Sequence, residues 1–282
     1  MHLATIMTAA PRTVAPETPL DEALKVMDAT YVRHLPVVGE SGRLVGLVSD
    51  RDLLEATGWL PGTARIDESG VRHRASRVGE IMKTQVVTAS PEDTVVTAAV
   101  DLVGRHIGCL PILRQGILIG IVSESDVVGA YLRHVEALRE HDESNPSIEH
   151  VMTWHPTTIA CDATIAEARR IMRVDDIRHL PVVEAGQLVG MLSDRDLRRA
   201  YGMGRSKDAS VEDVMSRDVV TLSTLARAKD AAAAFLRNRI SALPVIDESG
   251  AQRLLVGIVT VTDMLDHCLG TLRGGESMPE AV

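Results

Sequence analysis

The sequence predicts an α/β fold built from four β-α-β-β-α units that pack as two pseudo-symmetric pairs. The first observation behind this prediction is an internal copy, since residues 178–197, RHLPVVEAGQLVGMLSDRDL, nearly repeat the stretch that begins at Arg33. The second is a set of fixed spacings: in four segments a Met is followed six residues later by Thr and twenty-nine residues later by Pro. The third is that every segment closes on Gly-x-x-Ser/Thr-x-x-Asp. Recurrence at fixed offsets indicates a repeat architecture.

Within a repeat, the elements can be assigned in order. The Thr precedes a short apolar strand remnant, and residues 18–29, TPLDEALKVMDA, then carry apolar side chains at helical spacing. The runs at 35–38 and 43–49 are β-branched and separated by a Gly-bearing turn, which predicts two paired strands. A second helix begins at the Ser-x-x-Asp stretch. The anchor residues of the four repeats are Met7, Met82, Met152 and Met215, then Thr13, Thr88, Thr158 and Thr221, then Pro36, Pro111, Pro181 and Pro244.

The expected domain organisation is two modules of two repeats each, because repeats 1 and 3 match most closely and indicate duplication of a two-repeat unit. A unit of about fifty residues buries too little apolar surface to be stable alone, so the repeats should pack in pairs. Polar linkers at 58–77, 140–147 and 202–210 separate the units. Module 1 is expected at 1–139, with repeats at about 3–57 and 78–135, and module 2 at 148–282, with repeats at about 148–201 and 211–270.

Composition excludes several classes of function. The 282 residues are 45% hydrophobic but only 2% aromatic, so the chain has few aromatic side chains on which to stack bases. A net charge of −9 disfavours binding to phosphate backbones or anionic membranes. No window approaches the ~18 apolar residues of a membrane span, and the N-terminus lacks the apolar run of a signal peptide. We therefore expect a cytoplasmic protein without nucleic-acid or membrane partners.

No metal site and no catalytic cofactor are expected. The three cysteines lack C-x-x-C spacing, and the histidines show no spacing typical of metal ligands. The sequence contains no P-loop, Rossmann, H-E-x-x-H or G-x-S-x-G motif. The residues concerned are Cys109, Cys161, Cys268, His134, His141, His150 and His155.

The Ser-x-x-Asp stretch supports two compatible interpretations. Ser49 and Asp52 have the spacing of a capping box, in which the two side chains satisfy each other's backbone donors. A helix N-terminus also attracts phosphate, and a carboxylate can accept both hydroxyls of a vicinal diol, so a nucleotide fits this turn. Gly46, three residues before Ser49, weakens a strand and indicates either close approach of a ligand or crowding between strands.

Basic residues distinguish repeats 1 and 3 from repeats 2 and 4. Arg favours bidentate contact with phosphate, and His adds a donor that depends on its protonation. A solvated strand edge preserved by duplication is the alternative explanation. The basic residues are Arg33, His34 and Arg51 in repeat 1 and Arg178, His179 and Arg195 in repeat 3. Repeats 2 and 4 instead carry Gly108-Cys109, Ser125, Ser241-Ala242 and Thr262.

The framework from Met to Pro, followed by G-x-x-[ST]-x-x-D, resembles the CBS domain family, named after cystathionine β-synthase. The resemblance covers nearly the whole chain, in all four repeats. It implies that paired repeats form Bateman modules, that two modules assemble as a flat disc, and that adenosine-containing ligands, chiefly AMP, ADP and ATP, bind in clefts between paired repeats. The arrangement of four repeats resembles the gamma subunit of AMP-activated protein kinase, although this likeness implies no kinase partner.

The resemblance also implies roles for individual residues. Asp52, Asp126, Asp196 and Asp263 would accept ribose hydroxyls, and Ser49, Ser123, Ser193 and Thr260 would contact ribose or phosphate. Thr13, Thr88, Thr158 and Thr221 would border the adenine, together with the adjacent backbone of Val14 and Ile159. The sequence leaves open whether the Thr and the Asp of one cleft come from the same repeat or from different repeats. Repeats 1 and 3 would contact phosphate, whereas repeats 2 and 4 would hold an uncharged adenosine moiety or nothing.

We therefore expect a non-enzymatic regulatory protein that senses energy or nucleotide state by binding AMP, ADP or ATP, with or without magnesium. Its readout would act on an unknown effector protein, and the chain would be a monomeric disc or a homodimer. One alternative is an enzyme that acts on nucleotides through Asp50 or Asp194, but no activated base or metal cluster accompanies these carboxylates. The other alternative is a scaffold whose ligand clefts are relics.

Overall fold

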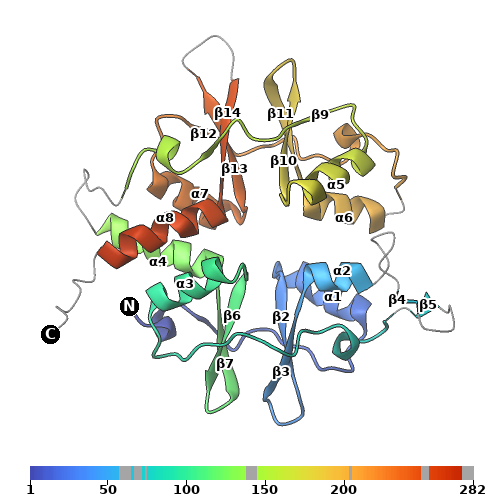
Figure 1. Cartoon of the computed structure of the whole chain (residues 1–282), viewed down its shortest axis with the longest axis vertical. Helices are drawn as coiled ribbons and strands as arrows, with labels where there is room; N and C mark the ends of the chain where they lie inside the picture. The colour runs from blue at the N-terminus through green and yellow to red at the C-terminus, as the bar shows by residue number, and fades with distance from the viewer. Residues whose placement is uncertain are drawn as a thin grey trace. The chain divides into compact units, whose positions relative to one another are not determined.

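Each repeat folds into a helix, an antiparallel strand pair and a second helix, so the predicted α/β fold of repeated units is confirmed (Figure 1). The computed structural model describes residues 1–56, 65–66, 72–73, 75–137, 145–202, 205–248 and 254–274. Most of the predicted linkers at 58–77 and 140–147, with His141, lies outside the described residues, as do residues 203–204 of the third linker. Contacts divide the chain into an N-terminal unit, residues 1–127, and a C-terminal unit, residues 128–282.

The N-terminal unit contains repeats 1 and 2. Repeat 1 comprises α1 (Leu20–Thr30), β2 (His34–Val38), β3 (Leu44–Ser49) and α2 (Asp50–Ala56). Repeat 2 comprises α3 (Val95–Gly104), β6 (Cys109–Arg114), β7 (Ile117–Ser123) and α4 (Glu124–Glu136), and the division between the units falls inside α4. Shorter elements are η1 (Leu3–Thr5), β1 (Thr8–Ala9), β4 (Arg65–Ile66), β5 (Arg72–His73) and η2 (Val78–Glu80).

The C-terminal unit contains repeats 3 and 4. Repeat 3 comprises η3 (Ile148–His150), β8 (Thr153–Trp154), β9 (Ile159–Ala160), α5 (Ile165–Val174), β10 (His179–Glu184), β11 (Gln187–Ser193) and α6 (Asp194–Gly202). Repeat 4 comprises η4 (Val211–Asp213), β12 (Leu222–Ser223), α7 (Ala228–Asn238), β13 (Ala242–Asp247), β14 (Leu254–Thr260) and α8 (Val261–Gly274).

The two long strands of each repeat pair in the same register. In repeat 1, His34 lies opposite Ser49 and Val37 lies opposite Gly46, and the register then shifts at a bulge after Val37. The other repeats keep this pattern, with a bulge at the corresponding position. The residue directly before each Leu-Pro motif is therefore held beside the Ser or Thr that precedes the second helix. The corresponding pairs are Cys109 with Ser123, His179 with Ser193 and Ala242 with Thr260.

The short segment that begins at each anchor Met pairs with the other repeat of its unit. We call these segments the heads, residues 7–9, 82–84, 152–154 and 215–217. The head of repeat 1 forms β1, in which Thr8 lies opposite Ile121 of repeat 2, and Lys83 of the repeat 2 head lies opposite Leu47 of repeat 1. The C-terminal unit repeats this exchange, since β8 of repeat 3 pairs with β14 of repeat 4 and Ser216 lies opposite Met191. The repeats within each unit are thus interlocked.

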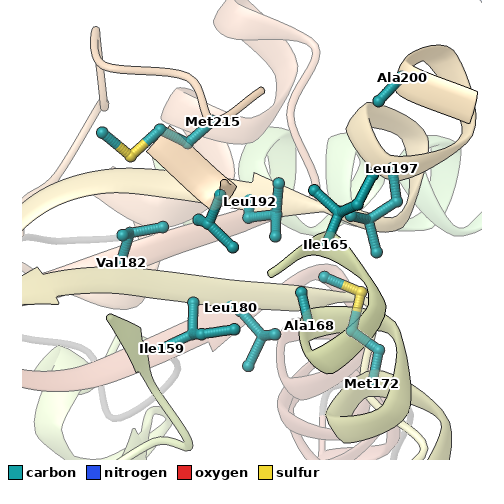
Figure 2. Close-up of a cluster of buried hydrophobic side chains, with 11 residues drawn as sticks. Ile159, Ile165, Ala168, Met172, Leu180, Val182, Leu192, Leu197, Ala200 and Met215 are labelled. Carbon is teal, nitrogen blue, oxygen red and sulfur yellow. The ribbon is translucent and has the colours of Figure 1, made fainter. Parts of the chain in front are cut away.

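The core of each repeat lies between its strand pair and its helices. Figure 2 shows this cluster in repeat 3, where aliphatic side chains of β10 and β11 gather with those of α5 and α6. Leu180, Val182 and Leu192 are fully buried there. Leu35, Val37 and Val48 occupy the equivalent places in repeat 1. Burial of each such side chain contributes roughly 1.5–3 kcal/mol, which holds the second strand and the start of the second helix in a fixed place.

Candidate functional site

A capping box closes the second strand of every repeat. Each Asp Oδ2 accepts a hydrogen bond from the backbone N–H of the Ser or Thr three residues earlier, at 2.7–2.8 Å, and from its hydroxyl, at 2.5–2.7 Å. In repeats 1, 3 and 4, the hydroxyl oxygen also accepts from the Asp N–H at 3.2–3.3 Å. The capping interpretation is confirmed. The pairs are Ser49 with Asp52, Ser123 with Asp126, Ser193 with Asp196 and Thr260 with Asp263.

The boxes fix the aspartates without using both carboxylate oxygens. Oδ2 takes both bonds of each box, so Oδ1 lies outside it, and all four aspartates are partly exposed. Asp52 Oδ1 lies 3.8 Å from Lys83 Nζ in the head of repeat 2, a cation that was not among the residues predicted from the sequence. Lys83 directly follows Met82 in the sequence. Its contact with Asp52 would have been predictable only if the head of repeat 2 had been expected to pair with repeat 1. A carboxylate oxygen has two lone pairs, so an Asp fixed in the capping box can still accept hydrogen bonds from the hydroxyl groups of a ligand.

Asp263 differs in its electrostatic environment. Burial raises the pKa of its carboxyl, the hydrogen bonds from Thr260 oppose this change, and the nearby Asp266 adds to it. The ionised form that would accept hydroxyl hydrogens is therefore less favoured at this box than at an exposed aspartate.

The strand glycines make room for methionines rather than for a ligand. A Cβ added to Gly46 would lie 2.5 Å from Met82 Sδ, and one added to Gly190 would lie 2.5 Å from Met215 Sδ. Each glycine meets the anchor Met of the other repeat in its unit, and the remaining pairs are Gly120 with Met7 and Gly257 with Met152. Of the two explanations left open by the sequence, crowding is the one observed, but the crowding group is a side chain from the partner repeat.

The basic pair of repeat 1 reaches into repeat 2. Arg33 Nη2 lies 3.3 Å from Glu124 Oε2, and these side chains are 30% and 16% exposed. Glu124 directly follows Ser123 of the repeat 2 box. The His34 ring lies against Gly108, where an added Cβ would be 2.7 Å from His34 Cε1. Arg33 belongs to repeat 1, but its guanidinium contacts the start of the second helix of repeat 2.

The basic pair of repeat 3 has a different environment. His179 Nε2 lies 3.1 Å from Ser241 Oγ in repeat 4, so this histidine also reaches the partner repeat. The position equivalent to Glu124 is Val261, which is 3% exposed. Arg178 is exposed, and among the described residues its side chain has no ion-pair partner.

A pocket in the C-terminal unit brings one predicted residue next to the partner repeat. It has a volume of about 110 Å³ and is lined by Leu188 and Val189 of β11 and by Arg217, Val219, Thr221 and Ile246 of repeat 4. Arg217 was not expected here, and its Nη2 lies 2.8 Å from Glu212 Oε1. Small-molecule pockets commonly exceed about 300 Å³, so this pocket fits part of a nucleotide rather than a whole one.

The remaining predicted residues are dispersed over the repeats. Thr13 and Thr88 are exposed and Thr158 is partly exposed, and among the described residues none of the three is hydrogen-bonded to a box aspartate. Arg51 and Arg195 are exposed on the first turns of α2 and α6. Val14 and Ile159 are buried and lie beside Val37 and Val182 in parallel pairing.

The described residues include no group of three or more His, Cys, Asp and Glu side chains that could hold a metal ion. Asp194, named for the enzyme alternative, lies 3.6 Å from Arg198 in an ion pair.

In the part of the chain that the structure describes, none of the helices has the length and apolar character needed to cross a membrane.

Comparison with known proteins gives a family match along most of the chain. The CBS domain matches four times, at residues 3–58, 78–133, 148–202 and 211–270. The uncharacterized protein MJ1225 of Methanocaldococcus jannaschii is 27% identical over 273 residues, which cover 90% of this chain and 94% of that protein. Its crystal structure, described as that of a proposed archaeal homolog of g-AMPK, superposes with a TM-score of 0.77, covering 95% of this chain and 99% of that chain at 26% identity.

Matches to enzymes are partial. The inosine-5'-monophosphate dehydrogenase of Korarchaeum cryptofilum is 29% identical over 205 residues, which cover 73% of this chain but only 38% of that enzyme.

A further structure, from Pyrococcus horikoshii, has a TM-score of 0.65 at 21% identity, which supports the fold alone.

Proposed function

Because the chain belongs to the CBS domain family and carries four such domains as two Bateman modules, we propose that it is a non-enzymatic regulatory protein that binds adenosine-containing nucleotides. AMP, ADP or ATP would occupy clefts between the paired repeats, and occupancy would report the energy or nucleotide state to a separate effector protein. The observation that carries this proposal is the box aspartate. In every repeat its Oδ2 is held by the preceding Ser or Thr, and its Oδ1 lies outside the box.

The chemistry of the box suits a ribose. The vicinal hydroxyls of a ribose are donors, and a carboxylate held in one orientation accepts them without first losing rotational freedom. At α4, α6 and α8 the first turn also presents backbone N–H groups and a partial positive charge, which favour the phosphate. The contact of Arg33 with repeat 2 and of His179 with repeat 4 supports clefts that draw residues from both repeats of a unit.

The interlocked heads supply a route from binding to response. A ligand that contacts both repeats of a unit stabilises one arrangement of those repeats over another, and only such differential affinity shifts a conformational equilibrium. A micromolar ligand carries about 8 kcal/mol of binding free energy. If about 2 kcal/mol of this distinguished two arrangements, their ratio would change roughly thirtyfold.

One observation favours a second candidate, a scaffold with relic clefts. The pocket beside Thr221 has about 110 Å³, which is less than a nucleotide needs without movement of its walls.

A titration separates these candidates. Protein stripped of ligand by unfolding and refolding should be titrated by calorimetry with adenosine, AMP, ADP, ATP and S-adenosylmethionine. We expect micromolar binding of at least one adenine nucleotide, weakened tenfold or more by Asp196→Ala. Asp230→Ala is the matched control, because Asp230 Oδ2 accepts from the Arg227 N–H at 2.8 Å at the start of α7, outside the Gly-x-x-Ser/Thr-x-x-Asp motif. Absence of binding by all five ligands would favour the relic scaffold, and release of product from ATP and magnesium would favour an enzyme.

A further inference from the structure

We propose that Glu124 and Val261 give the two units different preferences for ligand charge. The cleft beside the Ser123–Asp126 box would take a weakly charged or uncharged adenosine compound, and the cleft beside the Thr260–Asp263 box would take a phosphorylated one. This inference rests on the proposed function and adds the charge of the ligand at each cleft. It replaces the expectation that repeats 2 and 4 behave alike.

The two arginines start from equivalent places in the fold. The Arg33 carbonyl accepts the Asp50 N–H at 2.9 Å, and the Arg178 carbonyl accepts the Asp194 N–H at the same distance. Each is followed by a histidine that lies opposite the box Ser of its own repeat, since His34 pairs with Ser49 and His179 pairs with Ser193. The backbone therefore presents both arginines alike, and differences between them come from their surroundings.

In the N-terminal unit, Glu124 neutralises the arginine. Its Oε2 lies 3.3 Å from Arg33 Nη2, and both side chains are largely shielded from solvent. Glu124 lies between Ser123 and Asp126, so two carboxylates share one helical turn. A phosphate entering here would have to displace Glu124 from Arg33 and would remain close to its negative charge. Partial burial reduces screening by solvent, which makes this repulsion stronger than at an exposed site.

In the C-terminal unit, the same position is apolar. Val261 follows Thr260 as Glu124 follows Ser123, and its side chain is buried. Arg178 is exposed, and no described residue forms an ion pair with it. Its planar guanidinium therefore keeps its donors for a bidentate phosphate contact. The difference between a neutralised and an unneutralised arginine is therefore set by a single residue in each unit.

The cation Lys83 does not reverse this difference. It lies 3.8 Å from Asp52, at the other box of the N-terminal unit, and Ser216 stands at the equivalent position of the C-terminal unit. Lys83 consequently balances the aspartate of repeat 1 and leaves the pairing of Arg33 with Glu124 unchanged.

The test compares charged and uncharged ligands on four variants of the full chain. Adenosine, AMP and ATP are titrated by calorimetry into the wild type, Arg33→Ala, Arg178→Ala, Glu124→Gln and Glu124→Val, after thermal unfolding has verified that each variant is folded. We expect Arg178→Ala to weaken ATP binding at least tenfold and to change adenosine binding less than twofold. Arg33→Ala should change ATP binding less than threefold, and both Glu124 variants should strengthen AMP binding about tenfold in the N-terminal unit.

The outcomes separate the two proposals. If adenosine and the nucleotides bind, but the two arginine variants lose ATP affinity equally and the Glu124 variants behave as the wild type, the charge assignment is wrong and nucleotide binding stands. If none of the ligands binds to any variant, the proposed function fails, and the charge assignment fails with it. Glu124→Val introduces the residue found at the equivalent position of the C-terminal unit. If Glu124→Gln strengthens AMP binding but Glu124→Val does not, the charge assignment is also contradicted.

Discussion

Met215 occupies the space in which a side chain on Gly190 would lie, since a Cβ there would be 2.5 Å from the Met215 sulfur and 3.1 Å from the Ser216 carbonyl oxygen. This contact joins the head of repeat 4 to the second strand of repeat 3. The other three pairs of anchor Met and strand Gly repeat it. Every repeat carries an anchor Met and a strand Gly, and each Met meets the Gly of the other repeat in its unit.

Gly190→Ala should therefore destabilise the protein. The Met215 side chain can move, but the Ser216 backbone is held in the sheet, so we expect a loss of about 1–3 kcal/mol in the free energy of unfolding. Urea denaturation measures it. Gly104→Ala is the control, because nothing beyond its chain neighbours and its own helix backbone lies within 4 Å of the added Cβ, and it should leave stability unchanged or slightly raised. Equal effects of the two substitutions would contradict the interlock.

The hydroxyl of the box residue should matter more than its size. Thr260→Ala removes the bonds between the hydroxyl and Asp263 and should cost about 1 kcal/mol in the free energy of unfolding. Thr260→Ser keeps the hydroxyl and should cost much less. If chemical denaturation finds that Thr260→Ser is as destabilising as Thr260→Ala, the methyl group rather than the capping box holds the start of α8.

The folded protein should expose one reactive thiol. Burial raises the pKa of Cys109 to about 12, with Glu124 adding to the effect, and burial also raises the pKa of Cys268. Cys161 is only partly buried. Ellman's reagent at mildly alkaline pH should modify Cys161 alone in the native state and all three thiols in denaturant. Cys161→Ser should abolish the native signal, and rapid modification of Cys109 would be inconsistent with its packing.

Asp263 should make stability depend on pH in an unusual direction for a carboxyl group. Because its folded pKa is raised above the ordinary value of 3.8, the folded state binds the proton more tightly than the unfolded state. The contribution is fully present below the unfolded pKa and is lost as the pH rises through the folded pKa. Urea unfolding should show that the wild type gains stability relative to Asp263→Asn as the pH falls from neutral to mildly acidic. The opposite trend would mean that the Thr260 hydrogen bonds outweigh burial.

The sequence alone predicted the elements and the boxes because both depend on local patterns. The spacing of Ser49 and Asp52 is sufficient to indicate their hydrogen bonds, and the apolar periodicity of residues 18–29 coincides with α1. Contacts between repeats were not predictable in this way. An anchor Met and a strand Gly recur in every repeat, but this recurrence does not indicate that Met82 of repeat 2 packs against Gly46 of repeat 1.

Arg33 illustrates the same limit at the candidate site. It is one repeat away from Glu124 in the sequence, and only the pairing of repeats brings the two within 3.3 Å. A comparison of equivalent positions in repeats 2 and 4 would have found Glu124 opposite Val261 in the alignment. It would not have shown that Arg33 faces Glu124.

A crystal structure of the protein with AMP bound tests the central claim most directly. We predict that the 2′- and 3′-hydroxyls lie within about 3 Å of a box aspartate, with the base in contact with residues of the paired repeat. Nucleotide bound away from all four aspartates, or clefts filled by the protein's own side chains at saturating AMP, would contradict it.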